Sequence, residues 1–215
     1  MFDPRSQITA IIPAYNEAAT IADVIKPLVA SNVFRDVIVV SDGSTDGTAA
    51  AAREAGASLV KELKPNRGKG GAMRAGAELA ATPFIMFCDA DLLGLQPRHP
   101  KLLIAPILAC VCDMCVGIRD RGPFLTWVSR HLPPITGERV LSRESFLDIP
   151  PELIQGFRVE IAINAYFRNH KLKVCSRVMP GVGIRRKMQK VGFWKGLKGY
   201  ISMFAQVIRA TFSRY

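Results

Sequence analysis

A short apolar segment that ends in two acidic residues constrains the fold of this chain more than any other feature. Residues 84–88 (FIMFC) follow the helix breaker Pro83 and are too few for a helix, so we expect a buried strand of a parallel sheet. Asp89 and Asp91 come directly after this strand. Ligands bind at the carboxyl ends of the strands in open α/β sheets, and carboxylate oxygens suit hard cations such as Mg²⁺ or Mn²⁺. Two carboxylates are too few to hold an ion alone, so the segment predicts a metal-bridged diphosphate; the alternative is a solvated acidic loop.

Three units of apolar strand, polar loop and helix precede this segment. Strands are expected at 8–12, 37–40 and 57–61, and helices at 17–30, 48–55 and about 66–80. Asn16 is expected to cap the first helix, and Thr45 or Asp46 the second. The third helix opens with a glycine-lysine loop, in which backbone amides and Lys69 can approach a phosphate.

The same alternation continues after the acidic pair, with less regularity. Helices are expected at 100–109 and near 157–164, and strands at 114–118 and 173–178. Residues 135–144 are interpreted as a polar cluster, and the helix near 157–164 is expected to pack its apolar face under the sheet. Alternating strands and helices predict an α/β fold with a mostly parallel sheet flanked by helices.

The composition fits one globular α/β domain. The chain has 215 residues, of which 49% are hydrophobic and 22% charged. We expect no secretory signal and no membrane span, because the longest apolar run, 102–118, contains Pro106 and Asp113. Three of the five cysteines form a C-x-C-x-x-C pattern in an apolar run without a second ligand cluster, so we expect buried, unpaired thiols and no zinc site. Unpaired thiols without a signal indicate the cytoplasm.

The positive charge is concentrated in the last quarter of the chain. Residues 161–215 contain 12 Lys and Arg residues and no Asp or Glu. This segment therefore accounts for the whole net charge of the chain, which is +11. Apolar residues recur there at helical spacing, at Phe193, Trp194, Leu197, Tyr200, Ile201, Phe204, Val207 and Ile208. We expect residues 181–215 to form a basic segment with an amphipathic helix on an anionic membrane surface. The alternatives are a helix packed on the domain or the seam of a homodimer.

Four loop segments, in order, resemble the family 2 glycosyltransferases of the GT-A fold. They are 11–17 (IIPAYNE), 41–48 (SDGSTDGT), 66–72 (NRGKGGA) and 89–91 (DAD). The resemblance implies a Rossmann-like catalytic domain over residues 1–180, with a nucleotide-sugar half, 1–120, and an acceptor half, 121–180. It also implies a nucleoside-diphosphate sugar as donor, with UDP favoured over GDP, and a Mn²⁺ or Mg²⁺ ion as cofactor.

The resemblance assigns roles to single residues in the first half. Those implied to bind the nucleotide are Pro13, Ala14, Tyr15, Glu17, Asp42, Gly68, Lys69, Asp89 and Ala90. Asp89 and Asp91 are implied to bind the metal ion, which makes Asp91 a candidate catalytic residue. The structural alternatives are a packed ring for Tyr15, a first-turn acid for Glu17 and a turn former for Asp42.

The acceptor half resembles two different groups of this family. Residues 135–143 (ITGERVLSR) are similar to the acceptor segment of dolichyl-phosphate mannose synthases, which implies that Arg139 and Ser142, assisted by Arg119, bind a lipid phosphate. Such an acceptor is already ionised, requires no strong general base and fits an inverting transfer. Residues 156–161 (GFRVEI) are instead similar to glucosyl-3-phosphoglycerate synthases, which implies retention and a small anionic acceptor.

Two carboxylates are candidates for a general base. If the acceptor is a hydroxyl, Glu138 or Glu160 would remove its proton. The alternative for Glu160 is a structural ion pair with Arg158, Arg185 or Arg186.

The expected function is metal-dependent hexosyl transfer to a phosphate-bearing or lipid-linked acceptor, in the cytoplasm and peripherally on the inner face of the membrane. A nucleotidyltransferase would carry a glycine-rich loop after the first strand, where this chain has PAYNE. A nucleic-acid-binding or scaffold protein would explain the basic last quarter but not the loops at the strand ends, so no nucleic-acid partner is expected.

Overall fold

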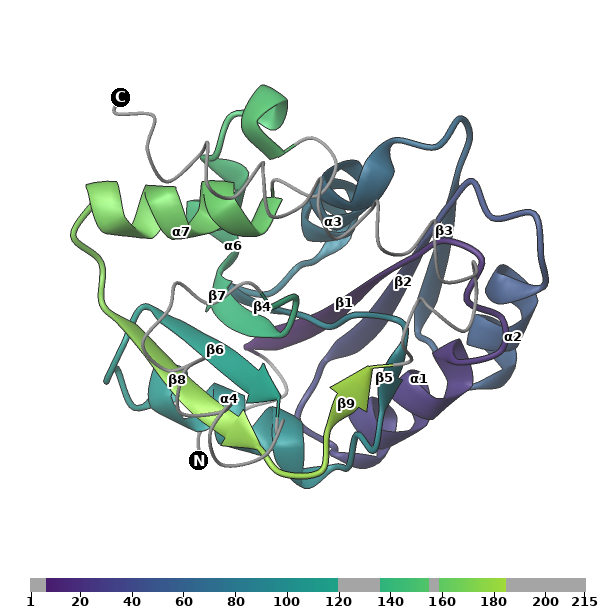
Figure 1. Ribbon diagram of the computed structural model, residues 1–215, viewed down its shortest axis with the longest axis horizontal. Helices are drawn as coiled ribbons and strands as arrows, with labels where there is room; N and C mark the ends of the chain where they lie inside the picture. Colours follow the sequence, from purple (N-terminus) through teal and green to yellow (C-terminus); the bar gives the residue numbers. More distant parts are fainter. Residues whose placement is uncertain (1–6, 120–135, 155–158, 185–215) are drawn as a thin grey trace, which may run out of the picture. The chain divides into compact units, whose positions relative to one another are not determined.

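This computed structural model describes residues 7–119, 136–154 and 159–184. A seven-stranded sheet forms the centre of these residues (Figure 1). The chain divides into two compact units, Met1–Gly183 and Ile184–Tyr215, and the described residues belong to the first, apart from Ile184. The strands of the sheet are β1 (Ile8–Ala14), β2 (Asp36–Asp42), β3 (Leu59–Leu63), β4 (Phe84–Phe87), β6 (Met114–Arg119), β7 (Arg139–Ser142) and β8 (Val174–Met179). A separate short ladder pairs β5 (Leu92–Leu93) with β9 (Gly183–Ile184).

The strand order is β3-β2-β1-β4-β7-β6-β8, and β7 is the antiparallel member among the described strands. β1 pairs in parallel with β2 and β4, β2 with β3, and β6 with β8. β7 runs antiparallel to both of its neighbours, β4 and β6. The carboxyl ends of β1, β2, β4 and β6 and the start of β7 therefore meet at one edge of the sheet. The predicted mostly parallel sheet is confirmed.

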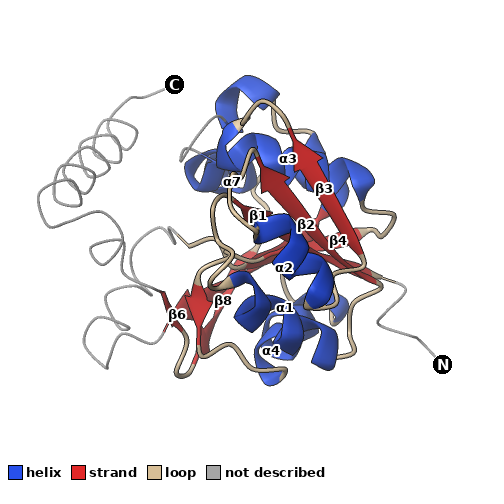
Figure 2. Ribbon diagram, turned by 90° about the vertical axis from the view of Figure 1, so that its right-hand side faces the viewer, coloured by secondary structure: helices blue, strands red, loops and turns tan. Residues whose placement is uncertain are grey.

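Helices cover both faces of the sheet (Figure 1, Figure 2). They are α1 (Ile21–Ala30), α2 (Thr48–Glu54), α3 (Gly68–Leu79), α4 (Arg98–Leu108), α6 (Arg143–Leu147), the 3-10 turn η2 (Pro151–Ile154) and α7 (Val159–Asn169). Helices α3, α6 and α7 lie on one face, and α1, α2 and α4 lie on the other. Gly76 allows α3 to lie close to β1, because a Cβ at this position would overlap the side chain of Ile11.

The hydrophobic core follows from the alternation of side chains along the strands. On the face of α3 and α7, buried side chains such as Ile11 and Phe87 pack with Met73, Ile163 and Phe167. The apolar face of α7 thus packs on the sheet, as the sequence predicts. Side chains on both faces of β1, β2 and β4 are buried, which explains why these strands are almost continuously apolar.

Local expectations about the first two helices are wrong, and the N-cap of α2 is Gly47 and neither Thr45 nor Asp46. The first helix begins at Ile21 and not at residue 17, and Asn16 has a left-handed backbone (φ 54°) and caps no helix. Residues 135–144 are not simply a polar cluster, because they contain strand β7 and the start of α6. The amphipathic helix expected after Phe193 lies outside the described residues. Within the described residues, none of the helices has the length and apolar character that a membrane span requires.

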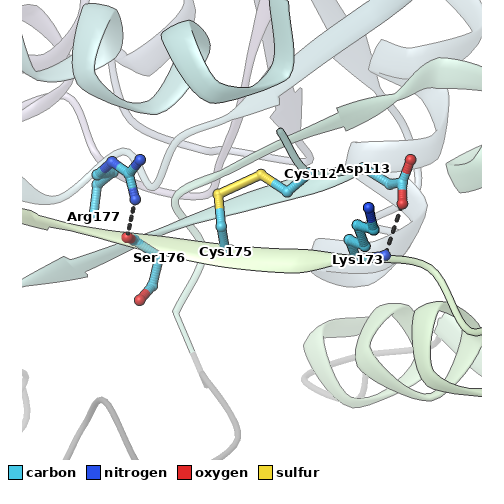
Figure 3. The surroundings of a disulfide bond; sticks show 6 residues. All are labelled: Cys112, Asp113, Lys173, Cys175, Ser176 and Arg177. Atoms are coloured by element: carbon cyan, nitrogen blue, oxygen red, sulfur yellow. Dashed lines mark hydrogen bonds between the residues drawn. A yellow bond between two sulfur atoms is a disulfide. The ribbon is translucent and has the colours of Figure 1, made fainter. Parts of the chain in front are cut away.

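The expectation of buried, unpaired thiols in the C-x-C-x-x-C pattern is confirmed for Cys115 and wrong for Cys110 and Cys112. Cys112 precedes β6 and Cys175 lies on the neighbouring strand β8, and the two form a disulfide with Cα atoms 5.9 Å apart (Figure 3). Cys110 is free and exposed, whereas Cys88 and Cys115 are free and buried. The prediction of a cytoplasmic location therefore loses the support that it drew from unpaired thiols.

Candidate active site

The candidate site lies at the sheet edge where β1, β2, β4 and β6 end. Polar residues follow each of these strands, and β7 begins at the same edge. Helices α3 and α7 begin near it and contribute one charged side chain each, Lys69 and Glu160. The topology thus brings residues from the two predicted halves of the domain to one place.

The loops that follow β1 and β2 are joined through Asn16. Its backbone N–H donates to the hydroxyl of Ser44 at 3.1 Å, and its side-chain Oδ1 accepts from the N–H of Thr45 at 2.9 Å. The left-handed conformation of Asn16 is one that asparagine tolerates better than most residues. Tyr15 beside it is 53% exposed, so its ring is available to a ligand and is not packed in the core.

Glu17 stabilises the same junction. Its backbone N–H donates to Thr48 Oγ1 at 2.9 Å, and its carboxylate accepts from the hydroxyl of Thr20 at 2.9 Å. Asp46 contributes a further link, because its Oδ2 accepts from the N–H of Ala18 at 3.2 Å. The two loops therefore form one hydrogen-bonded platform at the mouth of the sheet.

Asp42 connects this platform to the glycine-lysine loop. Its buried carboxylate accepts from the backbone N–H of Arg67 at 2.7 Å, and Asn66 Nδ2 donates to its carbonyl oxygen at 2.6 Å. Gly68 follows with φ +76°, a value that favours glycine, and donates its N–H to Asn66 Oδ1 at 2.9 Å. Asp42 thereby fixes the start of α3 and the position of Lys69.

Five side chains of alternating charge form a chain of contacts, named here the charge network: Glu160, Lys69, Asp89, Arg119 and Glu138. Lys69 Nζ lies 2.6 Å from Glu160 Oε1 and 2.7 Å from Asp89 Oδ1. Arg119 lies 3.9 Å from Asp89 Oδ2 through Nη2 and 3.2 Å from Glu138 Oε2 through Nε. Each carboxylate thus has a cationic partner, which offsets the cost of burying it.

Burial and neighbouring charges set the protonation states of the network. Burial alone would raise the pKa of Asp89, but Lys69 and Arg119 outweigh it and hold that pKa below its ordinary value. Burial lowers and the two flanking carboxylates raise the pKa of Lys69, with a net increase that keeps it protonated. Burial, and then the charge of Asp89, raise the pKa of Glu138. Glu138 Oε1 is buried and makes no hydrogen bond within the described residues, as expected for an oxygen that takes up a proton readily.

The residues predicted to bind the acceptor are not all brought together. Arg119 belongs to the charge network, but Arg139 is fully buried and donates to the carbonyl of Thr136 at 2.5 and 3.2 Å and to Asn164 on α7 at 3.3 Å. Ser142 pairs with Phe84 at the opposite end of β4. It is the N-cap of α6, which is a structural role. The structure therefore places Arg119, and not Ser142, beside Asp89.

The acidic pair is the candidate metal site. Asp89 and Asp91 offer hard oxygen donors, and Gly137 leaves room for the Asp89 carboxylate, which a Cβ at that position would overlap. Within the described residues, no group of three or more His, Cys, Asp or Glu side chains is placed to hold an ion. The oxygen donors of Asp89 and Asp91 fit a hard divalent ion such as Mg²⁺ or Mn²⁺.

Sequence reasoning missed three contributors to the site. The hydroxyl of Thr136 donates to Glu138, Gly137 lies against Asp89, and Asn164 holds the guanidinium of Arg139. The segment Thr136-Gly137-Glu138 was visible as a polar cluster, but its position beside Asp89 depends on the pairing of β7 with β4. The sequence also gives no sign that Glu160 pairs with Lys69, which lies 91 residues earlier in the chain. The arginines expected to pair with Glu160 lie outside the described residues.

Comparison with known proteins agrees with this architecture. Residues 9–174 match the family model "Glycosyl transferase family 2". The dolichyl-phosphate beta-glucosyltransferase of Drosophila melanogaster is 37% identical over 117 residues, which cover 47% of this chain and 36% of the relative. The glucosyl-3-phosphoglycerate synthase of Mycobacterium tuberculosis is 28% identical over 194 residues, which cover 73% of this chain and 59% of the relative. The chain thus spans between about a third and three-fifths of the length of these relatives.

Solved structures extend the similarity to three dimensions. The M. tuberculosis synthase in complex with Mn²⁺, UDP-glucose and phosphoglyceric acid aligns with a TM-score of 0.73 and 25% identity, over 86% of this chain and 74% of that one. The same enzyme in complex with Mg²⁺ and UDP aligns with a TM-score of 0.72. The match of the family model over most of the chain, together with this architecture, means that the chain belongs to glycosyl transferase family 2 and has the GT-A fold.

Proposed function

We propose that this chain transfers a sugar from a UDP-sugar to a phosphate-bearing acceptor with the help of a divalent cation. The observation that carries the proposal is the position of Asp89. It follows β4 at the carboxyl edge of the sheet, lies between Lys69 and Arg119, and precedes Asp91 by two residues. Asp89 and Asp91 would hold the metal ion, and the neighbouring cations Lys69 and Arg119 would attract the diphosphate of the donor.

The donor would lie across the platform formed by the first two loops. Tyr15 is exposed enough to contact the base, and Asp42 is fixed by Arg67 at the end of β2, where it can accept from the base or ribose. Lys69 lies 2.7 Å from Asp89 at the same edge of the sheet, where its ammonium group can contact the diphosphate. UDP is proposed over GDP because the solved synthase of similar fold holds UDP-glucose.

Asp89 and Asp91 are the residues that would hold the metal ion. The ion, when bound, neutralises negative charge on the leaving nucleoside diphosphate. Lys69 and Arg119 add positive charge at the same place, and the two flanking carboxylates outweigh burial and raise the pKa of Lys69, which keeps it protonated. The departing diphosphate would thus meet charges that are positioned before the reaction begins.

The carboxylates near the site favour an acceptor that needs no base from the protein. Glu138 is fully buried, and Glu160 is held by Lys69 at 2.6 Å. Both carboxylates are engaged within the charge network, Glu138 with Arg119 and Glu160 with Lys69, whereas a general base must lie within hydrogen-bond reach of the proton that it removes. A phosphate acceptor is ionised at neutral pH and attacks without losing a proton, so we propose a lipid-linked phosphate and an inverting transfer.

A second candidate is a retaining transfer to a small phosphorylated acceptor. The M. tuberculosis synthase bound to phosphoglyceric acid supports it through a fold that aligns over 86% of this chain. The two candidates share the donor site and differ in the acceptor and in the configuration of the product.

The experiment that tests the proposal incubates the full chain with UDP-glucose, Mn²⁺ and either a polyprenyl phosphate or 3-phosphoglycerate. Product is expected with one acceptor, and proton NMR of its anomeric signal distinguishes inversion from retention. Asp91→Asn should abolish turnover while circular dichroism stays that of the folded chain, because the change alters a metal ligand and not core volume. Full activity of this variant would refute the metal assignment. No product with a wider panel of nucleotide sugars would refute the proposed function.

The membrane partner remains a proposal that concerns residues outside the described ranges. The stripe that begins at Phe193, beside basic residues, is typical of a helix on an anionic surface. A chain that ends before Phe193 should bind vesicles of anionic lipid more weakly than the full chain. If the full chain does not bind such vesicles, the homodimer seam or a packed helix becomes the better interpretation.

A further inference from the structure

The charge network contains one contact that a ligand from solvent can reach. The side chains of Lys69 and Asp89 are 22% and 19% exposed, whereas those of Arg119, Glu160 and Glu138 are 9%, 7% and 0% exposed. The ion pair between Lys69 and Asp89 therefore faces the open side of the network. Its other members form a buried support behind it.

This accessible contact occupies a proposed metal ligand. Lys69 Nζ lies 2.7 Å from Asp89 Oδ1, and Arg119 Nη2 lies 3.9 Å from Asp89 Oδ2, so both oxygens of Asp89 face a cation of the protein itself. A divalent ion that binds Asp89 must compete with these cations, and with the nearer Lys69 first. A metal ion alone should therefore bind weakly.

Lys69 is held in a way that lets it release Asp89 and stay in place. Its second partner, Glu160, lies 2.6 Å away on α7 and is less exposed than Asp89. When Asp89 moves to a metal ion, the ammonium group keeps one buried carboxylate and regains one donor for an incoming anion. The oxygens of a diphosphate are the anion that arrives with the metal ion in the function proposed above.

We infer that Lys69 is a positioning residue that holds Asp89 until metal and diphosphate arrive together, and that it then exchanges Asp89 for the diphosphate. This inference rests on the proposed function. It means that Mn²⁺ and UDP bind cooperatively and that Lys69 is the source of much of the coupling. Such coupling is reciprocal, so each ligand strengthens the other by the same factor.

The test measures Mn²⁺ binding without any nucleotide. The electron paramagnetic resonance signal of free Mn²⁺ gives its affinity for the wild-type chain and for Lys69→Met, which keeps an unbranched side chain and removes the charge. Lys69→Met should bind Mn²⁺ alone about fivefold more tightly or better, because Asp89 has lost its competitor. In calorimetric titrations of UDP, the factor by which Mn²⁺ strengthens binding should be smaller in the variant than in wild type.

A matched control separates competition from a general change in charge. Arg67→Met removes one positive charge at the N-cap of α3, and the backbone N–H that Arg67 donates to Asp42 is retained. Its affinity for Mn²⁺ alone should stay within about twofold of wild type. Lys69→Gln repeats the measurement if Lys69→Met does not fold, since glutamine can still donate to Glu160.

The outcomes separate this inference from the proposed function. The exchange by Lys69 is refuted if the neutral Lys69 variants bind Mn²⁺ no more tightly than wild type. It is also refuted if Arg67→Met gains as much affinity for Mn²⁺ as they do. Both results hold even when wild type binds UDP with Mn²⁺. If wild type binds neither UDP nor GDP at any Mn²⁺ concentration, the proposed donor site is refuted. The affinity for Mn²⁺ alone then still decides whether Lys69 competes for Asp89.

Discussion

Gly137 is the position where the smallest change should have the largest effect on the site. A Cβ at Gly137 would lie 2.5 Å from Cγ and 2.6 Å from Oδ2 of Asp89. Non-bonded carbon atoms pack best at about 3.5–4.0 Å, so Gly137→Ala requires the Asp89 carboxyl group to move by about 1 Å. The alternative, a shift of the backbone that enters β7, would disturb its pairing with β4.

The magnitude follows from the displacement of Asp89, the proposed metal ligand, and the contact with Lys69 shows how far that displacement reaches. Lys69 lies 2.7 Å from Asp89 Oδ1. A shift of about 1 Å would bring the pair to roughly 3.7 Å, beyond the range of an N–H···O hydrogen bond. A misplacement of that size in a catalytic arrangement costs about 100-fold in rate, or about 2.7 kcal/mol of transition-state stabilisation. Overpacking should also lower the free energy of unfolding by about 1–3 kcal/mol.

The assay compares kcat/KM of Gly137→Ala and wild type with UDP-glucose, Mn²⁺ and the productive acceptor, and compares UDP binding by calorimetry. Gly47→Ala is the control, because nothing lies within 4 Å of a Cβ at Gly47. It should fold and retain activity within about twofold, as expected for a surface substitution. A folded Gly137→Ala chain with kcat/KM within threefold of wild type would refute the reasoning, since activity would then not depend on the position of the Asp89 carboxyl group.

Two further predictions concern stability. Burial raises the pKa of Asp46, but hydrogen bonds, with that from Thr48 foremost, outweigh it and lower the pKa. A lowered folded-state pKa contributes stability above the unfolded value of about 4, and this contribution is lost as the pH falls. Because the Asp46 side chain is exposed and solvent screens its charge, Asp46→Ala should cost less than about 1 kcal/mol at pH 7 and still less at pH 3. Urea titrations at both pH values that give equal differences would contradict this. The disulfide closes a loop across 63 residues, so replacing Cys112 and Cys175 by serine should lower the free energy of unfolding by up to about 4 kcal/mol. Cys110→Ser should change it by less than about 0.5 kcal/mol, and equal effects in urea titrations would argue against the disulfide as a source of stability.

The parts of the fold that the sequence predicts are those with a strong local signal. β1, β2 and β4 are continuous apolar runs because both of their faces are buried, and each is followed by a polar loop. Parallel strands that end at one edge then bring Tyr15, Asp42 and Asp89 to the same side of the sheet, as expected. The location of the donor half of the site thus follows from local pattern and from one topological rule.

The parts that the sequence does not predict depend on contacts between distant residues. β7 has only four residues and begins with Arg139, whose burial is made favourable by Thr136 and by Asn164 on α7. No local pattern distinguishes such a strand from a polar loop. The pairing of Lys69 with Glu160 likewise requires knowledge of where α7 begins relative to α3.

The first helix shows a local signal that tertiary contacts override. Asn16 has the residue type of a helix cap, yet its side chain binds Thr45 in the neighbouring loop, and the helix starts only at Ile21. The disulfide was missed for a related reason. Cysteines in an apolar run have the pattern of core residues, and only the pairing of β6 with β8 brings Cys112 and Cys175 together.

The antiparallel strand β7 has a consequence for the order in which the molecule can be assembled. It lies between β4 and β6, although it follows both in the chain, so these two strands present unpaired edges until residues 139–142 insert between them. Unpaired apolar edges are sites of aggregation, and we expect a chain that ends after β6 to self-associate despite retaining Asp89 and Asp91. The same insertion delivers Gly137 and Glu138 to the site. Closure of the sheet thus supplies one end of the charge network, and the packing of α7 supplies the other end, Glu160.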